Sequence, residues 1–270
     1  MKLVNDTPRL IEHVSNILNE NTRGEKFFPE DVQDESSMSA VLFLLGLKTR
    51  ENDAAPEPCL ILNKRSKKVR QPGDLCCPGG RVSPRIDSFL SKILTLPFFP
   101  LARWPYWSGW HKKSPQQARL LALLFATSLR ESFEEMQLNP FDVKFLGPHP
   151  PLSLIMTQRD IYPMVGWLNS QKKFRPNWEV DEIVYIPLED LLNPENYRRF
   201  RIRITQKDRM TINESSELKQ FAESMKQDYP GFLLREQNRQ QVLWGLTYRM
   251  VITFLEDMFD FTPPEMSECP

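Results

Sequence analysis

The chain has 270 residues, enough for one large domain with a sizeable core, and it carries 35 basic and 35 acidic side chains. The balanced charge argues against non-specific nucleic-acid binding as the main role. The four cysteines and three histidines form no spaced zinc motif, which favours a reduced, cytoplasmic setting over a disulfide framework.

The first half of the chain predicts one helix and a pair of strands. The N-terminus has no apolar core of signal-peptide type and predicts a helix with Thr7 as N-cap and Pro8 in its first turn. Apolar runs at 39–47 and 58–66 predict paired strands. A loop rich in proline and glycine, "QPGDLCCPGGRVSP", follows at 71–84.

Residues 88–115 interrupt this pattern with aromatics and prolines, and Lys92 and Arg103 argue against a membrane-spanning helix there. Ser114 is the expected N-cap of a helix that runs from about Pro115 to Leu138. Short strands are expected at 143–147, 162–168 and 181–188, then a helix near 187–197 and an amphipathic helix over 238–259. Without a regular βαβ rhythm, the class is α+β, with helices on the faces of a mixed sheet.

The segment "LRESFEEMQL" (129–138) concentrates carboxylates. Helical spacing places Glu131, Glu134 and Glu135 on one face and Leu129, Phe133 and Met136 near the opposite one. Such a face is either solvated or a site for Mg²⁺ or Mn²⁺, which prefer oxygen ligands. The segment alone leaves both interpretations open.

Together, "PGG", "RESFEE" and Leu138 resemble the signature of the Nudix hydrolase superfamily. Three further stretches resemble its coenzyme A pyrophosphatase branch: "LILNKRSKKVRQPGDLCCPGG", "PLEDLLNPENY" and "LWGLTYRMV". The resemblance implies a Nudix-like α/β/α sandwich with a mixed sheet. It divides the chain into an N-terminal helix and linker (1–37), a Nudix hydrolase domain (38–262) and a flexible tail (263–270).

The resemblance also implies a divalent-metal-dependent pyrophosphohydrolase of a nucleoside diphosphate derivative, most closely coenzyme A or an acyl-coenzyme A. Mg²⁺ or Mn²⁺ would be held by Glu134, Glu135 and the Gly79 carbonyl, with Glu131 as a further ligand or as proton acceptor. Lys64, Arg65 and Gly80 would contact the substrate, although the two basic residues also fit a solvated basic run. Glu179 and Glu182 are weaker candidates for a second base or ligand, with a solvent face as the alternative.

Two other functions stay open. One is a non-catalytic Nudix-fold module that binds a nucleotide or a protein; the other is a Nudix hydrolase of another nucleotide, such as NADH. A pure binding module has no need of all three glutamates, so their presence favours an enzyme.

The sequence departs from the family pattern inside the signature. Arg130 lies 50 positions after Gly80, so an insertion of about 88–115 splits a motif that is continuous in the family. Asp87 is the nearest candidate for the upstream acidic position, and Gln137 occupies the usual glycine place. We expect the insertion to serve as a lid, a homodimer contact or a peripheral membrane contact, unless its aromatics pack on their own domain.

Overall fold

The computed structural model describes residues 3–22, 27–29, 34–48, 55–154, 159–171, 173–200, 228–236 and 239–264. Of the expected C-terminal tail, residues 265–270 lie outside these ranges.

A mixed β-sheet forms the centre of the molecule. Strand β1 (Ser39–Lys48) runs parallel to β7 (Arg159–Leu168) and antiparallel to β2 (Glu57–Arg65). Both neighbours extend the sheet by antiparallel pairing: β8 (Val180–Pro187) joins β2, and β5 (Val143–Pro148) joins β7. Three short strands add to it: β3 (Leu75–Cys76), β4 (Gly79–Arg81) and β6 (Leu152–Leu154). The α+β class and the mixed sheet are therefore confirmed.

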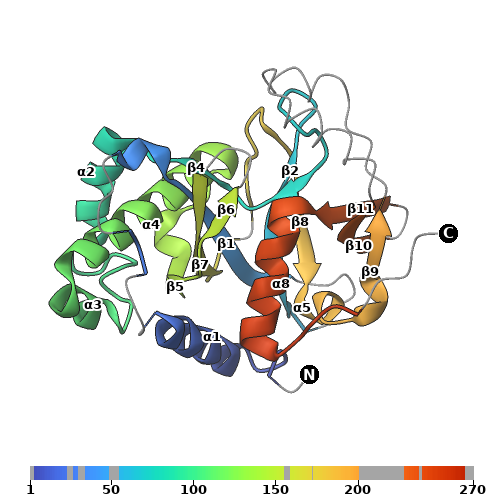
Figure 1. Ribbon diagram of the computed structural model, residues 1–270, viewed down its shortest axis with the longest axis horizontal. Coiled ribbons are helices and arrows are strands. Elements are labelled where there is room, and N and C mark those ends of the chain that lie inside the picture. The colour runs from blue at the N-terminus through green and yellow to red at the C-terminus, as the bar shows by residue number, and fades with distance from the viewer. Residues whose placement is uncertain are drawn as a thin grey trace.

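Helices cover both faces of this sheet (Figure 1). One side carries α2 (Pro84–Leu94), α3 (Trp107–Lys113) and α4 (Pro115–Met136). The other carries α1 (Thr7–Asn21) and α8 (Gly245–Phe259). Alternate residues of β1 supply the two cores, with Leu42 and Leu44 in the α4 cluster and Phe43 and Leu45 in the α8 cluster.

Smaller elements complete the described chain. A second sheet has the order β11 (Arg239–Trp244), β10 (Tyr229–Glu236) and β9 (Tyr197–Phe200). The short helix α5 spans Leu188–Leu191, and single 3-10 turns span Glu35–Ser37, Pro140–Asp142 and Pro194–Asn196.

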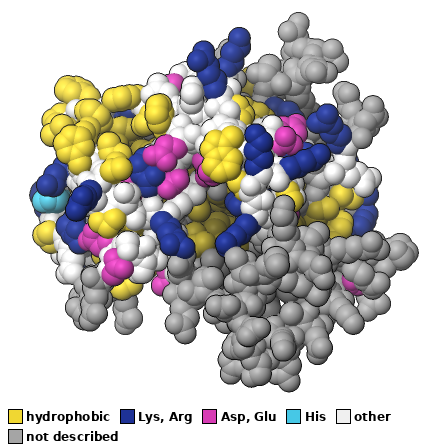
Figure 2. Space-filling model, turned by 90° about the horizontal axis from the view of Figure 1, so that it is seen from above, with side chains coloured by type: hydrophobic (Ala, Val, Ile, Leu, Met, Phe, Trp, Pro, Cys, Tyr) yellow, Lys and Arg dark blue, Asp and Glu magenta, His cyan; other side chains and the backbone are white. Residues whose placement is uncertain are grey.

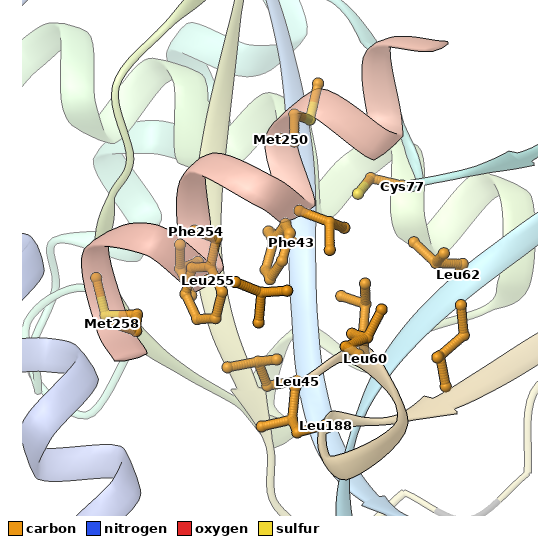
Figure 3. Close-up of a cluster of buried hydrophobic side chains, with 14 of the residues drawn as sticks. Phe43, Leu45, Leu60, Leu62, Cys77, Leu188, Met250, Phe254, Leu255 and Met258 are labelled. Atoms are coloured by element: carbon orange, nitrogen blue, oxygen red, sulfur yellow. The ribbon is translucent and has the colours of Figure 1, made fainter. Parts of the chain in front are cut away.

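A cluster of buried apolar side chains joins α8 to the sheet. Figure 3 shows Phe254 and Leu255 of α8 directed at Phe43 and Leu45 of β1, with Leu60 of β2 alongside. The Phe43 and Phe254 rings have centroids 4.6 Å apart. Burying each such side chain contributes about 1.5–3 kcal/mol, so this cluster anchors α8 to the sheet.

The structure corrects three local predictions. Asp6, not Thr7, caps α1, because its carboxylate accepts the Arg9 amide. The helix expected at 238–259 begins only at Gly245, since residues 239–244 pair with β10 as a strand. Phe133, expected on the packed face of the carboxylate helix, is exposed.

The insertion is partly built into the domain. Leu94, Leu101 and Trp104 are buried in the α4 core, and Trp104 Nε1 donates to the Leu146 carbonyl at 3.0 Å. The alternative that the aromatics of the insertion pack on their own domain therefore holds for Trp104, whereas Phe89 and Phe98 are exposed. Within the described ranges, no helix combines the length and the apolar character needed to cross a membrane.

Candidate active site

The two glycines of "PGG" allow β4 to lie close to both β1 and the carboxylate helix. Strand β4 pairs antiparallel with the start of β1. A Cβ at position 79 would stand 2.4 Å from the Ala40 carbonyl oxygen, and one at position 80 would stand 2.4 Å from a Glu131 carboxylate oxygen. Position 79 therefore requires glycine, because the β1 backbone blocks a side chain there, whereas a side chain at position 80 would displace only the flexible end of Glu131.

Glu135 faces this strand. Asn63 Nδ2 of β2 donates to its carboxylate at 2.7 Å, and the Gly79 amide also donates to it. Burial and then the charge of Glu131 raise the pKa of Glu135 to about 8, against the lowering effect of these hydrogen bonds. Glu179 adds to the rise, so its carboxylate acts on the same site. The environment of Glu135 thus disfavours the ionised form of its carboxyl group.

Arg130 joins the two separated parts of the signature. Its Nε lies 2.7 Å from Asp87 Oδ1, and its Nη1 lies 2.9 Å from Glu131. The fully buried Asp87 carboxylate also accepts the Ser83 amide at 2.7 Å and the Thr127 hydroxyl at 2.8 Å. Asp87 therefore lies where it can serve as the upstream acidic residue, although it is displaced in sequence.

These contacts also shift the pKa values of the charged residues on this face of α4. Partial burial alone would lower the pKa of Arg130, but its bonds to Asp87 and the charge of Glu131 raise it. Burial raises the pKa of Glu131, opposed by Arg130. Glu134 is exposed and lies 3.3 Å from Arg130. Because Arg130 is occupied by carboxylates of its own chain, it serves to order the helix face.

The glutamate carboxylates and the Gly79 carbonyl are oxygen donors of the kind that a hard divalent cation prefers. Their side chains, however, do not converge on one point as metal ligands do. Among the described residues, no three His, Cys, Asp or Glu side chains stand close enough to hold a metal ion. Glu131 instead faces Arg130, and Glu135 faces Asn63. The buried Asn63 Oδ1, beside Glu135, has no hydrogen-bond partner. Raised carboxyl pKa values and an unpaired oxygen are features that a bound cation would relieve.

The basic residues expected at the substrate lie on β2, next to Asn63. Arg65 Nε donates to the Arg70 carbonyl at 2.7 Å, and the Arg65 side chain also bonds Cys76. Lys64 lies 3.5 Å from Glu182, so this lysine and the weaker candidate Glu182 form an ion pair. Glu179, by contrast, acts electrostatically on Glu135.

The cysteines near the site are not poised as nucleophiles. Burial raises the pKa of Cys76 to about 11, and it also raises the pKa of Cys77. A thiol with a raised pKa is protonated at neutral pH and therefore unreactive.

Sequence reasoning missed two residues here. Asn63 is a buried amide in the otherwise apolar run "PCLILN", and a polar residue at such a position is a signal of a specific partner. Trp178 is exposed, and its carbonyl accepts the Ser66 hydroxyl at 2.8 Å. The preceding Asn177 amide donates to the Glu135 carbonyl, so the tryptophan is held beside the carboxylate helix.

Two curated proteins resemble the chain in sequence. The peroxisomal coenzyme A diphosphatase NUDT7 of Mus musculus is 28% identical over 162 residues, which cover 59% of this chain and 52% of the relative. The uncharacterized Nudix hydrolase NudL of Pectobacterium atrosepticum is 27% identical over 137 residues, covering 50% and 53%. The chain thus spans about half the length of the curated relatives it matches. No family model matches the chain.

Solved structures give weaker likenesses. A MutT/nudix family protein from Enterococcus faecalis covers 94% of this chain and 75% of its own, with a TM-score of 0.40 and 11% identity. A Nudix hydrolase from M. smegmatis, RenU, covers 57% and 72%, with a TM-score of 0.35 and 13% identity. These scores are too low to carry a functional conclusion.

Proposed function

We propose that this chain, which is similar to Nudix hydrolases, is a divalent-metal-dependent pyrophosphohydrolase of a nucleoside diphosphate derivative. The observation that carries the proposal is the meeting of β4 with α4. The Gly79 amide donates to Glu135, and Gly80 lies so close to Glu131 that a methyl group there would displace the Glu131 carboxylate. A solvated helix face would need neither contact.

Mg²⁺ or Mn²⁺ would be held by Glu131, Glu134, Glu135 and the Gly79 carbonyl. A bound divalent cation stabilises the negative charge that builds up on the phosphoryl oxygens and orients the attacking water. In the hydrolysis, a water oxygen bonds to phosphorus as the bridging P–O bond breaks, and the water's proton passes to a base. The glutamates are the candidates for that base.

The chain's own residues prepare this chemistry. Asn63 and the Gly79 amide fix the orientation of the Glu135 carboxylate. Arg130, anchored on buried Asp87, restrains Glu131 at the glycine strand. Preorganised groups need no rearrangement during the reaction, which is why such anchoring favours catalysis.

Coenzyme A or an acyl-coenzyme A is the substrate class we propose. The likeness to a coenzyme A diphosphatase supports it, and Arg65, Lys64 and Gly80 would contact the phosphates. Arg65 lies two residues after Asn63 on β2, and a guanidinium suits phosphate oxygens. Trp178 adds an exposed ring on the Glu135 side of the site, on which an adenine base could stack.

The test is a substrate screen with Mg²⁺ or Mn²⁺, with products identified by mass. Coenzyme A, an acyl-coenzyme A, NADH, a dinucleoside polyphosphate and a sugar nucleotide are compared. We expect coenzyme A to give adenosine 3′,5′-bisphosphate and a phosphopantetheine product. Glu135→Gln and Glu134→Gln should each lower turnover by about a hundredfold or more, because they remove charged donors from the reacting centre.

The exposed Glu12 of α1 provides a matched control, and Glu12→Gln should retain full activity. Turnover of NADH alone would replace the coenzyme A assignment but keep the reaction class. Nucleotide binding in calorimetry without turnover of any diphosphate would favour the non-catalytic module. Near-normal activity of Glu135→Gln at low metal would refute the metal assignment.

A further inference from the structure

The insertion exposes a stripe of large apolar side chains. They are Ile86 (52% exposed), Phe89 (65%), Leu96 (51%) and Phe98 (86%). Three lie at i, i+3 and i+10 along α2 and the turn after it, where a helical spacing keeps them near one face. The opposite face of α2 is buried through Asp87, Ser91 and Leu94. The helix therefore exposes apolar side chains to solvent while it buries two polar ones, Asp87 and Ser91, and packing within this chain does not account for that arrangement.

Phe98 adds a backbone observation. Residues 96–99 form a turn closed by the Phe99 amide on the Leu96 carbonyl at 3.2 Å, with Pro97 second and Phe98 third. The Phe98 φ of 74° is the left-handed value that a type II turn reserves for glycine or asparagine. A bulky residue is strained there, and its ring gains little packing in the molecule itself. A phenylalanine at the tip of this turn therefore does not stabilise the fold.

The charged residues within this segment of the sequence are almost all basic. Residues 81–113 contain six lysines and arginines: Arg81, Arg85, Lys92, Arg103, Lys112 and Lys113. All six are exposed, and the single acidic residue in this stretch, Asp87, is buried against Arg130. The whole chain has zero formal charge, so basic residues are concentrated here. Figure 2 shows hydrophobic side chains gathered at the left end of the molecule, with lysine and arginine side chains beside them.

We propose that this face, formed by α2 and the 96–99 turn, docks on an anionic phospholipid surface. Apolar side chains flanked by lysine and arginine are typical of helices that lie in the membrane interface. At 100° per residue, Arg85 and Lys92 lie beside the Ile86–Phe89 stripe on α2. The rings would enter the headgroup region while the basic side chains meet the lipid phosphates.

A second copy of the chain is less well matched to this face. Two identical faces related by a two-fold axis would bring like charges together. A phospholipid surface supplies both the apolar layer and the negative charge. This inference stands apart from the proposed hydrolysis, because none of the stripe residues is in the candidate active site.

The test is co-flotation of the purified chain with vesicles of phosphatidylcholine alone or of phosphatidylcholine mixed equally with phosphatidylserine. We expect binding to the mixed vesicles, weaker binding to the neutral ones, and loss of binding at high salt. Phe89→Ser should weaken partitioning into vesicles by about tenfold or more, since it removes one ring that the membrane would bury. Lys92→Glu should weaken it by at least about fivefold on the mixed vesicles only.

Phe98→Gly separates a docking role from a structural one. Glycine relieves the strained φ, so the variant should be at least as stable as the original in thermal unfolding while losing vesicle binding. Leu47→Ser is the matched control, because Leu47 is an exposed apolar residue near the far end of β1 from its pairing with β4. It should leave binding unchanged.

Three results would overturn the proposal. The first is absence of binding to mixed vesicles at low salt. The second is equal binding by Phe98→Gly, Phe89→Ser and the original chain. The third is a dimer in sedimentation that Phe98→Gly converts to monomer without any vesicle binding, which would assign the face to a second copy.

Discussion

Replacing Asp87 tests whether the buried ion pair holds the split signature together. The Asp87 carboxylate accepts four hydrogen bonds, two of them from Arg130 at 2.7 and 3.2 Å. Removing one partner of a buried, hydrogen-bonded pair costs about 3–5 kcal/mol, which is the loss we expect for Asp87→Ala. For a chain of this size, that lowers the melting temperature by about 10 °C.

Asp87→Asn is the more informative variant. It keeps the shape but replaces one acceptor by an amide that faces donors, and we expect a loss of about 2 kcal/mol in urea unfolding. In a double-mutant cycle with Arg130→Met, the two changes should be non-additive, because each removes the same contact. Asp181→Asn, at an exposed aspartate, is the control. A stability of Asp87→Asn within about 0.5 kcal/mol of the original would refute the reasoning.

Three further outcomes follow from the site. Gly80→Ala should leave the stability nearly unchanged, because only the flexible Glu131 carboxylate must move, but it should lower turnover by about a hundredfold. In Gly79→Ala the new methyl group meets the β1 backbone instead, and the free energy of unfolding should fall by about 2 kcal/mol. The metal-free protein should lose stability as the pH rises from about 4 toward about 8, because folding raises the pKa of Glu135 and the ionised form is disfavoured in the folded state. Glu135→Gln should flatten that part of the pH profile, and a profile identical to the original would contradict the assignment. Gln137→Gly should raise the unfolding free energy by about 1 kcal/mol, since residue 137 ends α4 with a φ of 54°; an unchanged or lower value would show that the Gln137 side chain supports the fold.

The elements with strong periodicity or clear caps could be predicted from the sequence. Ser114 caps α4 as expected, and the paired strands β1 and β2 are found within a residue or two of their expected bounds. Glu131, Glu134 and Glu135 lie on one helix, α4, as their spacing predicts. These features depend on local chemistry, so one chain is enough to predict them.

What the sequence could not supply depends on contacts between distant segments. Residues 239–244 read as the start of a helix, but pairing with β10 gives the backbone of this segment better partners as a strand. Asn63 belongs to the site because it donates to Glu135 of α4, a contact between distant segments that the sequence does not show. The insertion combined core residues such as Trp104 with surface residues such as Phe98, and composition does not distinguish the two.

The pairing of Asp87 with Arg130 also bears on the order in which the chain folds. It closes a segment of more than forty residues, whereas β1 and β2 meet across a connection of eight residues. Loop-closure entropy grows with the length of chain enclosed, so the contact that encloses the longer segment should form later. The β1–β2 hairpin should therefore acquire slow-exchanging amides early in refolding. The carboxylate face of α4 should gain its protection later, together with α2, so that the proposed active site would be completed among the last events of folding.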